Sequence, residues 1–459
     1  MTEPRTQRLR DPVHGLIVFR ESEMLDRLAW RLIDTPEFQR LRRIRQLGVS
    51  EFVFPSATHT RFAHSVGVFH TARSLVKIIK REIGADFDPK RAEVAVIAAL
   101  LHDVGHGPFS HAFEAVQESR DTEKRHEKWT AEIISNPDGS IRPLLEAHWE
   151  GGGFSEAVGE LLEADDPRDV YHAIVSSSFD ADRLDYLRRD RLMTGTGAGA
   201  IDFDWLMEHV RVREIIVEAP DSVDPDEGVK VPTFCLDPKA LPAAEQFLLA
   251  RYTLHEQVYF HKTTRCVEHM IAKLLRRVAR LAETKESAVQ TGLPEAHPLL
   301  RFLRPGGETL PNYLCLDDLV VLGAMQQMSE AKDSVLRILA TRLRERRLYK
   351  TLDVRVFGHK DEGRQRLAAR RIDAEFKTKI ENEQVIKDIG AAVSIYTQIG
   401  GDDERTHKKL HILDAKGPLE IVDMSALIRA LAQKVQFTRY YFENESDREL
   451  ARNPSRRQA

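Results

Sequence analysis

The sequence predicts a mainly α fold with small β-hairpins. Apolar residues recur every three or four positions across Phe38–Leu47 and across the long stretch Ala243–Ala282, which is the spacing of amphipathic helices. The uninterrupted apolar run Val94–Leu101 is typical of a buried helix, and it is followed by the helix-breaking sequence Gly105–Pro108. These three observations indicate a large helical core.

Two interruptions of the helical pattern predict strands. Gly15–Phe19 is a short β candidate near the start of the chain. Arg213–Val217 is expected to pair with Val229–Cys235 across an acidic loop rich in proline, glycine and aspartate. We therefore expect small β-hairpins beside the helices.

Composition divides the chain into a helical core and a smaller α+β C-terminal lobe. Proline, glycine and polar residues predict a connection between the two. Within the second lobe, Asp317–Arg347 is predicted to be helical, while Ala392–Ile395 and Leu419–Val422 resemble strands. The tail is rich in arginine, aspartate and asparagine and is expected to be disordered. The predicted boundaries are 1–285 for the core, 286–311 for the connection, 312–445 for the regulatory or oligomerisation lobe and 446–459 for the tail.

The overall composition limits the class of protein. An apolar content of 42% and a charged content of 31% are ordinary for a soluble globular chain. The net charge of −4 argues against general coating of nucleic acid. Cys235, Cys266 and Cys315 are far apart, which fits a reducing compartment. No leader or membrane-spanning run is recognisable, so we expect a cytoplasmic protein.

Four residues suggest a metal centre. His64, His102, Asp103 and Asp182 are separated by helix-length intervals, and His102–Asp103 directly follows the buried apolar run. Mixed imidazole and carboxylate ligands suit Mn, Fe, Zn or Ni, with Mg possible beside them. Each histidine alone is more often a hydrogen-bonded core residue, but the four together favour a metallohydrolase.

Extended motifs around these residues resemble the HD-domain phosphohydrolase superfamily, in its deoxynucleoside triphosphate triphosphohydrolase branch. The motifs are Arg61-x-x-His64, the block His102–His111, and Asp180-x-Asp182-x-x-Asp185-Tyr186. The opening block Asp11–Gly15 and the block Ile33–Arg42 match as well, so the resemblance runs from about Asp11 to Lys262.

The resemblance implies that the chain cleaves a dNTP between the α-phosphorus and the 5′ oxygen, releasing deoxynucleoside and inorganic triphosphate. It assigns the metal to His64, His102, Asp103 and Asp182, where the metal polarises the α-phosphate and supplies the nucleophile. His126 matches the histidine that protonates the leaving oxygen, and His111 matches a neighbouring active-site histidine. Taken singly, either histidine is equally well explained as structural.

The resemblance also assigns a substrate pocket. Basic side chains would hold the triphosphate, and an aromatic floor with a carboxylate and an amide would select deoxyribose. Arg183 stands where relatives have lysine, which changes the geometry of that phosphate contact. The residues assigned to the pocket are Arg61, Gln46, Leu47, Arg183, Tyr186, Asp190, His255, Tyr259 and Lys262. A helix face packed into the core explains the spacing of His255 and Tyr259 as well.

A second set of matched residues implies activation by GTP or dGTP. Asp34, Gln39 and Arg42 match residues that read guanine, and Arg346 and Lys350 match basic residues that reach the activator's phosphates from another subunit. Such a shared site favours a homotetramer built as a dimer of dimers. In the alternative, Asp34 only caps a helix.

Three further differences and three rival functions remain open. Arg10, Gln7 and Asp237 differ from the matched residues of mammalian members of this dNTP triphosphohydrolase branch, which changes the expected details of activator binding. The rivals are an HD phosphohydrolase acting on a different nucleotide, a single-strand 3′ exonuclease, and a nucleotide-sensing defence scaffold.

Overall fold

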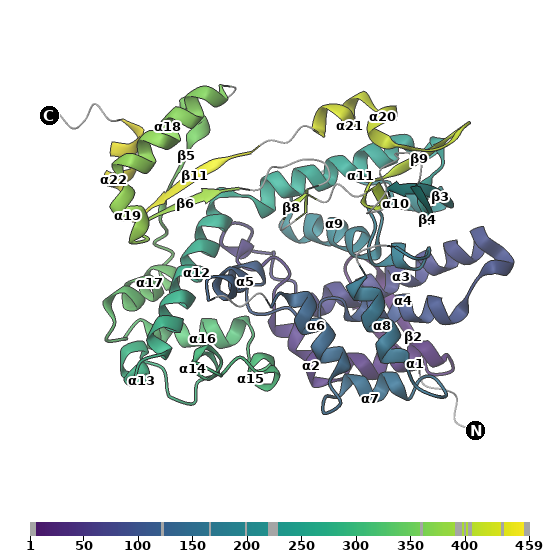
Figure 1. Cartoon of the computed structure of the whole chain (residues 1–459), viewed down its shortest axis with the longest axis horizontal. Helices are drawn as coiled ribbons and strands as arrows, with labels where there is room; N and C mark the ends of the chain where they lie inside the picture. The colour runs from purple at the N-terminus through teal and green to yellow at the C-terminus, as the bar shows by residue number, and fades with distance from the viewer. Residues whose placement is uncertain are drawn as a thin grey trace.

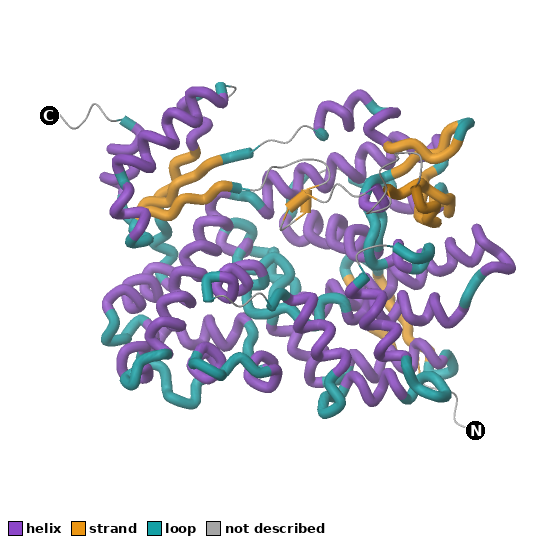
Figure 2. The backbone as a smooth tube through the Cα atoms, in the orientation of Figure 1, coloured by secondary structure: helices purple, strands orange, loops and turns teal. Residues whose placement is uncertain are grey.

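The structure is a computed structural model that describes residues 6–120, 124–164, 167–197, 200–218, 228–358, 361–390, 397–398, 401–402, 406–432 and 436–453. Helices dominate these residues, as predicted, and short strands lie at the periphery (Figures 1 and 2). No helix in the described ranges is both long and apolar enough to cross a membrane.

The described chain opens with an antiparallel hairpin of β1 (Thr6–Asp11) and β2 (Gly15–Arg20), in which Thr6 pairs with Arg20. This confirms the strand predicted at Gly15–Phe19. The Phe19 ring stacks on Phe69 with ring centroids 5.4 Å apart, so the hairpin packs against the helical core.

The helices of the first 200 residues pack against one another. Helix α4 begins with a proline directly after the capping residue Asp88. Its apolar run is buried, so the predicted buried helix is confirmed. Helix α3 packs against both α4 and α9. The helices of this part are α1 (Met24–Ile33), α2 (Pro36–Gln39), α3 (Arg61–Ile83), α4 (Pro89–Leu101), α5 (His111–Glu118), α6 (His126–Ser135), α7 (Ile141–Glu146), α8 (Phe154–Glu163) and α9 (Ala181–Thr194).

A four-stranded sheet joins the core to a late part of the chain. Its strand order is β10-β9-β4-β3, and β4 runs parallel to β9, with Cys235 opposite His411. The predicted pairing of Arg213–Val217 with Val229–Cys235 is confirmed. The elements are α10 (Phe203–Glu208), β3 (Val210–Glu218), β4 (Gly228–Leu236), β9 (His411–Asp414), β10 (Gly417–Glu420), α20 (Ile421–Met424) and α21 (Ala426–Leu431). The strand predicted at Leu419–Val422 is therefore only partly right, because the chain turns into α20 at Ile421.

The helical pattern predicted over Ala243–Ala282 is present but interrupted. Helix α11 (Leu241–Leu254) passes into a π-helical turn at His255–Tyr259, and α12 starts anew at Lys262–Ala282. Such π-turns are uncommon and frequently lie at functional sites.

The connection predicted at 286–311 stays a prediction as a boundary between domains. The structure folds part of it into short helices, and Leu299, Phe302 and Leu303 are fully buried. The predicted helical stretch Asp317–Arg347 is confirmed as two helices. The elements of this region are α13 (Ser287–Thr291), α14 (Pro298–Leu303), α15 (Leu310–Leu314), α16 (Asp318–Met328) and α17 (Ser334–Arg344).

A C-terminal lobe with a sheet of its own follows from Lys350, and the predicted domain boundaries themselves stay a prediction. Its three-stranded sheet has the order β5-β11-β6, and its own buried cluster includes Leu352, Ile372 and Tyr440. Figure 1 shows this lobe beside α12, where Arg265 donates to Asp388 of β6 at 3.0 Å. The elements are β5 (Lys350–Asp353), α18 (Glu362–Glu375), α19 (Lys377–Glu381), β6 (Val385–Ile389), β11 (Thr438–Phe442) and α22 (Glu445–Arg452), besides the small strands β7 (Thr397–Gln398) and β8 (Gly401–Asp402).

The tail of the chain is more ordered than its composition predicts. Disorder was predicted from Ser446, but the chain forms α22 up to Arg452 and buries Ala451 against the lobe. The strand predicted at Ala392–Ile395 lies outside the described residues.

Candidate metal centre and substrate pocket

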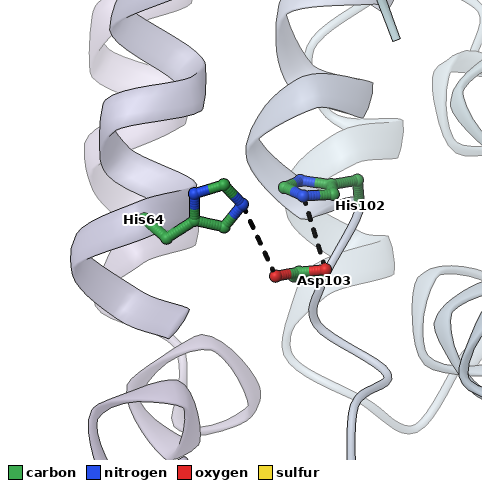
Figure 3. Close-up of side chains that lie close together, drawn as sticks. All are labelled: His64, His102 and Asp103. Carbon is green, nitrogen blue, oxygen red and sulfur yellow. Dashed lines mark ion pairs between the residues drawn. The ribbon is translucent and has the colours of Figure 1, made fainter. Parts of the chain in front are cut away.

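The four residues predicted to bind metal come together at the ends of three helices. His64 lies in the first turn of α3, His102 is the C-cap of α4 with Asp103 beside it, and Asp182 lies in the first turn of α9. The Nε2 atom of His64 is 2.9 Å from Asp182 Oδ1 and 3.8 Å from Asp103 Oδ2. The Nε2 atom of His102 is 3.4 Å from Asp103 Oδ1 (Figure 3).

The hydrogen bonds of His64 and His102 use their Nδ1 atoms and leave their Nε2 atoms free to bind a metal. The Nδ1 atom of His64 is bonded to Asp185 Oδ2 at 2.8 Å, and that of His102 to the carbonyl oxygen of Ala99 at 2.8 Å. The Nε2 atoms of both rings are buried and make no hydrogen bond within the described residues. Because each Nδ1 donates its hydrogen, each Nε2 keeps a lone pair directed at the carboxylates, as in metal-ligating histidines. The donor set therefore fits a divalent metal.

The electrostatics of the cluster favour a cation. Burial alone would lower the pKa of His64, but Asp182 and Asp185 outweigh it and raise that pKa to about 10. Burial would raise the pKa of Asp182, yet His102 and His64 hold it below its ordinary value. The carboxylates therefore favour a positive charge beside His64, and a metal bound at Nε2 requires the neutral ring.

Arg61 connects the metal-type cluster to the loop that follows α4. Its Nη1 donates to Asp103 Oδ2 at 2.5 Å, and its Nη2 donates to Ser110 Oγ at 2.8 Å. Burial would raise the pKa of the Asp103 carboxyl, but Arg61 and the neighbouring histidines keep it well below its usual range. Arg61 therefore lies beside the cluster, where it could also reach a phosphate.

A second cluster of histidines faces the same cavity. Glu114 joins two of the predicted residues, because its Oε1 is 2.6 Å from His126 Nδ1 and its Oε2 is 2.9 Å from His111 Nδ1. The ring of His106 stacks on His126 at 3.8 Å. Glu114 and His106 were not predicted as site residues, although the three-residue spacing between His111 and Glu114 on one helix was available as a signal.

The loop that carries these histidines is strained and strongly supported. Phe109 and Ser110 have φ of 54° and 47°, in the left-handed region. Arg40 Nη2 donates to the carbonyl oxygen of His106 at 2.7 Å, and Tyr313 Oη donates to that of Gly105 at 2.7 Å.

Asp318 completes this support. Its Oδ1 accepts from the backbone N–H of Phe109 at 2.7 Å, and its Oδ2 accepts from that of Arg45 at 2.8 Å. Burial raises the pKa of Asp318 to about 6. Residues on α15 and α16, assigned from composition to a different lobe, thus hold the active-site loop in place.

The two clusters open into a cavity of about 420 Å³. Most of the residues predicted to contact substrate line it, but Lys262 does not, although Arg265 and Glu268 from the same helix do. The predicted residues that line the cavity are Gln46, Leu47, Arg61, Arg183, Tyr186, Asp190, His255 and Tyr259.

A polar triad lies on one wall of this cavity. Tyr259 Oη donates to Asp190 Oδ2 at 2.6 Å, and His59 Nε2 lies 2.8 Å from Asp190 Oδ1. The ring of Tyr186 approaches Tyr259 edge-on, with centroids 6.3 Å apart. The buried Oε1 of Gln46 makes no hydrogen bond within the described residues. Asp190 is thus fixed in place and retains acceptor capacity toward the cavity.

Arg183 and His255 also line the cavity, and they differ in how far their polar groups can contact a ligand. Arg183 donates to the carbonyl oxygen of Ser177 at 2.8 Å and pairs with Asp180, so part of its guanidinium is engaged within the protein. Burial and the charge of Arg251 lower the pKa of His255 to about 3, so that ring is neutral near pH 7.

The residues predicted to bind an activator lie on the surface. Asp34 is exposed at the C-terminal end of α1, and the side chain of Thr35, rather than Asp34, caps the next helix. The alternative that Asp34 serves as an N-cap is therefore wrong. Gln39 Oε1 accepts from Arg42 Nε at 2.8 Å. Arg346 Nη2 donates to the carbonyl oxygen of Phe52 at 2.9 Å, whereas Lys350 is exposed.

Comparisons with known proteins agree with this architecture. The HD domain matches residues 61–190, and an HD associated region matches residues 230–292. The uncharacterized protein YwfO of Bacillus subtilis is 30% identical over 437 residues, which covers 93% of this chain and 89% of YwfO. A crystal structure of a phosphohydrolase from Bacteroides thetaiotaomicron superposes with a TM-score of 0.71 at 25% identity, covering 96% of this chain and all (100%) of that one.

A further relative carries a more specific name. The human deoxynucleoside triphosphate triphosphohydrolase SAMHD1 is 30% identical over 290 residues. The match covers 57% of this chain but only 43% of SAMHD1, so it spans less than half of that relative.

Proposed function

The chain belongs to the HD-domain family of phosphohydrolases, and from this premise we propose that it hydrolyses dNTPs to deoxynucleoside and inorganic triphosphate. The observation that carries the proposal is a single cavity lined by members of all three groups: His102, Asp103 and Asp182 of the metal-type cluster, His126, and Asp190 with Tyr259. Glu114 supports His126 from behind, at 2.6 Å from its Nδ1. The name of the relative SAMHD1 supports the same substrate class.

The metal would be held by His64, His102, Asp103 and Asp182, whose inner donor atoms face one another. When bound, a divalent ion supplies Lewis acidity to the α-phosphate and makes a water molecule more acidic. Mn, Fe, Zn and Ni suit this donor set, and Mg would suit the triphosphate.

The protein's own groups would complete the reaction. Arg61 and Arg183 would neutralise phosphate charge, because guanidinium groups form paired hydrogen bonds with phosphate oxygens. His126 would give the proton on its outer nitrogen to the leaving 5′ oxygen, since Glu114 holds its Nδ1 at 2.6 Å and so fixes the ring. His111, held by the same carboxylate, would bond a phosphate oxygen or the attacking water.

The sugar end of the cavity would select deoxyribose. Asp190 is held by Tyr259 and His59, so its remaining acceptor sites are oriented toward a 3′-hydroxyl. Gln46 offers a buried oxygen to the same hydroxyl. The ring of Tyr186 would pack beneath C2′, where a 2′-hydroxyl would meet an apolar surface and lose hydrogen bonds to water.

Activation by GTP or dGTP is the finer part of the proposal. Burial lowers the pKa of Arg42 and the charge of Asp34 partly opposes this, so the two side chains are close enough to interact. A carboxylate can accept from the guanine edge while Arg346 and Lys350 from a neighbouring subunit meet the phosphates. A site shared in this way would assemble a homotetramer.

Product analysis tests the proposal. Purified protein is incubated with Mn, Mg or Fe and single dNTPs, with and without GTP, and products are separated by chromatography. We expect deoxynucleoside and triphosphate, lost on replacing His126 or Asp182 by alanine, with metal retained only in the His126 variant. Nucleoside monophosphate, or activity confined to oligonucleotides, would reject the substrate assignment. An unchanged rate and oligomeric state with GTP would reject activation alone.

A further inference from the structure

A buried carboxylate behind the metal-type cluster connects it to the N-terminal hairpin. Asp185 is fully buried on α9 and contacts four donor atoms. Its Oδ2 is 2.8 Å from His64 Nδ1, and its Oδ1 is 2.6 Å from His14 Nε2. Arg189 donates to both oxygens, through Nε and Nη2, at 2.8 Å each. Because an ionised carboxylate only accepts, both imidazoles must donate to it.

The turn between β1 and β2 places His14 in this position. Asp11 Oδ1 accepts from the backbone N–H groups of Val13 at 2.8 Å and His14 at 3.0 Å, which closes the turn. Its other oxygen accepts from Arg189 Nη1 at 2.7 Å. The side chain of His14 is only 3% exposed, so the tip of the hairpin is anchored in the interior beside the carboxylate.

Helix α3 is shaped to admit this arrangement. A Cβ atom added at Gly67 would lie 2.0 Å from Asp185 Oδ1 and 2.4 Å from Arg189 Nη2. Both atoms belong to the buried hydrogen-bonded network, so any side chain at this position would displace it. The glycine one turn beyond His64 therefore keeps the carboxylate against the back of that imidazole.

From these contacts we infer that His14 is a positioning residue for the metal centre, acting through Asp185 on the orientation and tautomer of His64. The inference rests on the proposed metal centre but not on the choice of substrate. His14 donates to the Asp185 carboxylate and fixes its position. The carboxylate accepts the Nδ1 hydrogen of His64, so the Nε2 lone pair of His64 is directed at the metal centre. Outer hydrogen bonds of this kind fix metal-ligating histidines, and their loss typically costs about 10- to 100-fold in affinity.

Two amide replacements at His14 separate this role from simple packing. In His14→Gln the terminal nitrogen falls where the imidazole Nε2 lay, so the bond to Asp185 is kept. In His14→Asn the nitrogen falls at the Nδ1 position, out of reach of the carboxylate. The control is His70→Asn, because His70 is on α3 beside His14, with ring centroids 5.1 Å apart, and makes no hydrogen bond to Asp185 among the described residues.

The probe is cobalt(II), read through its visible absorption and its dissociation constant against a competing chelator. We expect His14→Asn to weaken cobalt binding about 10-fold and to shift the absorption bands, with His14→Gln and His70→Asn within about 2-fold of wild type. Circular dichroism checks that each variant folds, and the Gln variant still tests the inference if the Asn variant does not fold.

Three outcomes decide the question. Equal weakening in both His14 variants, or no change in either, would overturn the inference and leave the metal centre intact. A loss in His70→Asn as large as in His14→Asn would also overturn it, because the effect would then be one of packing. Failure of the wild-type protein to bind cobalt would instead reject the proposed metal centre.

Discussion

Arg439 links the C-terminal sheet to the wall of the substrate cavity, and its replacement by methionine tests whether the sheet positions that wall. Arg439 on β11 is 6% exposed, and its Nη1 donates to the carbonyl oxygen of Phe260 at 2.6 Å. Its Nε donates to Asp353 at 2.9 Å, and its guanidinium lies 3.9 Å from the Phe437 ring centroid. Phe260 directly follows the π-turn His255–Tyr259 and lines the cavity.

The expected size of the effect follows from these contacts. A hydrogen bond from a charged donor contributes about 1.5–3 kcal/mol, and the Phe260 carbonyl has no equivalent donor once Arg439 is replaced. If the looser π-turn weakens substrate binding by about 1.4 kcal/mol, KM rises about 10-fold. The residues nearest the cleaved bond come from other elements, so kcat should stay within about 3-fold.

The assay is steady-state hydrolysis of whichever dNTP the wild-type protein cleaves, with a thermal melt to check folding. Arg366→Met is the matched control, because Arg366 is an exposed arginine on α18 of the same lobe, paired with Glu362. An Arg439→Met protein with the wild-type KM, or with a reduced kcat at unchanged KM, would refute the reasoning.

Further predictions concern the reacting groups and their support. Glu114→Gln should lower kcat about 100-fold without loss of metal, whereas Glu118→Gln, at an exposed position, should leave kcat unchanged. An unchanged kcat in Glu114→Gln would contradict the role of Glu114. Asp318 has its pKa raised by burial from 3.8 to about 6, so the folded state binds its proton more tightly and wild-type stability falls by about 3 kcal/mol as pH rises through that window. Between about pH 4 and pH 7 the melting temperature of Asp318→Asn should therefore rise relative to that of the wild type. A difference between the two melting temperatures that stays constant with pH would contradict this prediction. Tyr186→Ala should improve ribonucleotide cleavage relative to dNTP about 10-fold, and an unchanged ratio would remove Tyr186 from sugar selection.

The positions of the metal-type residues could be predicted because their signals are local. His102 and Asp103 end a continuous apolar run, so the sequence alone predicts them at the end of a buried helix, and the structure confirms this. The position of Asp182 behind the capping residue Asp180 was found only in the structure. That these ends meet was implied by the resemblance to HD-domain proteins. The spacing within one helix does not show which other helix lies opposite.

The support of the active-site loop could not be predicted in the same way. Phe109 and Asp318 are 209 residues apart, and the value of that contact depends on the path of the whole chain between them. Composition alone did not show the short helices within 286–311, where proline and glycine lie between helical segments. Leu299 and Phe302 were the available signal, since apolar residues at helical spacing indicate a buried helix face.

In the proposed reaction, water attacks the α-phosphorus of a dNTP and the 5′ oxygen departs. The most direct measurement is hydrolysis in water enriched in heavy oxygen, followed by mass spectrometry of both products. The label should appear in the triphosphate, and the deoxynucleoside should carry none. Label in the deoxynucleoside, or formation of labelled monophosphate or pyrophosphate, would contradict the proposed reaction.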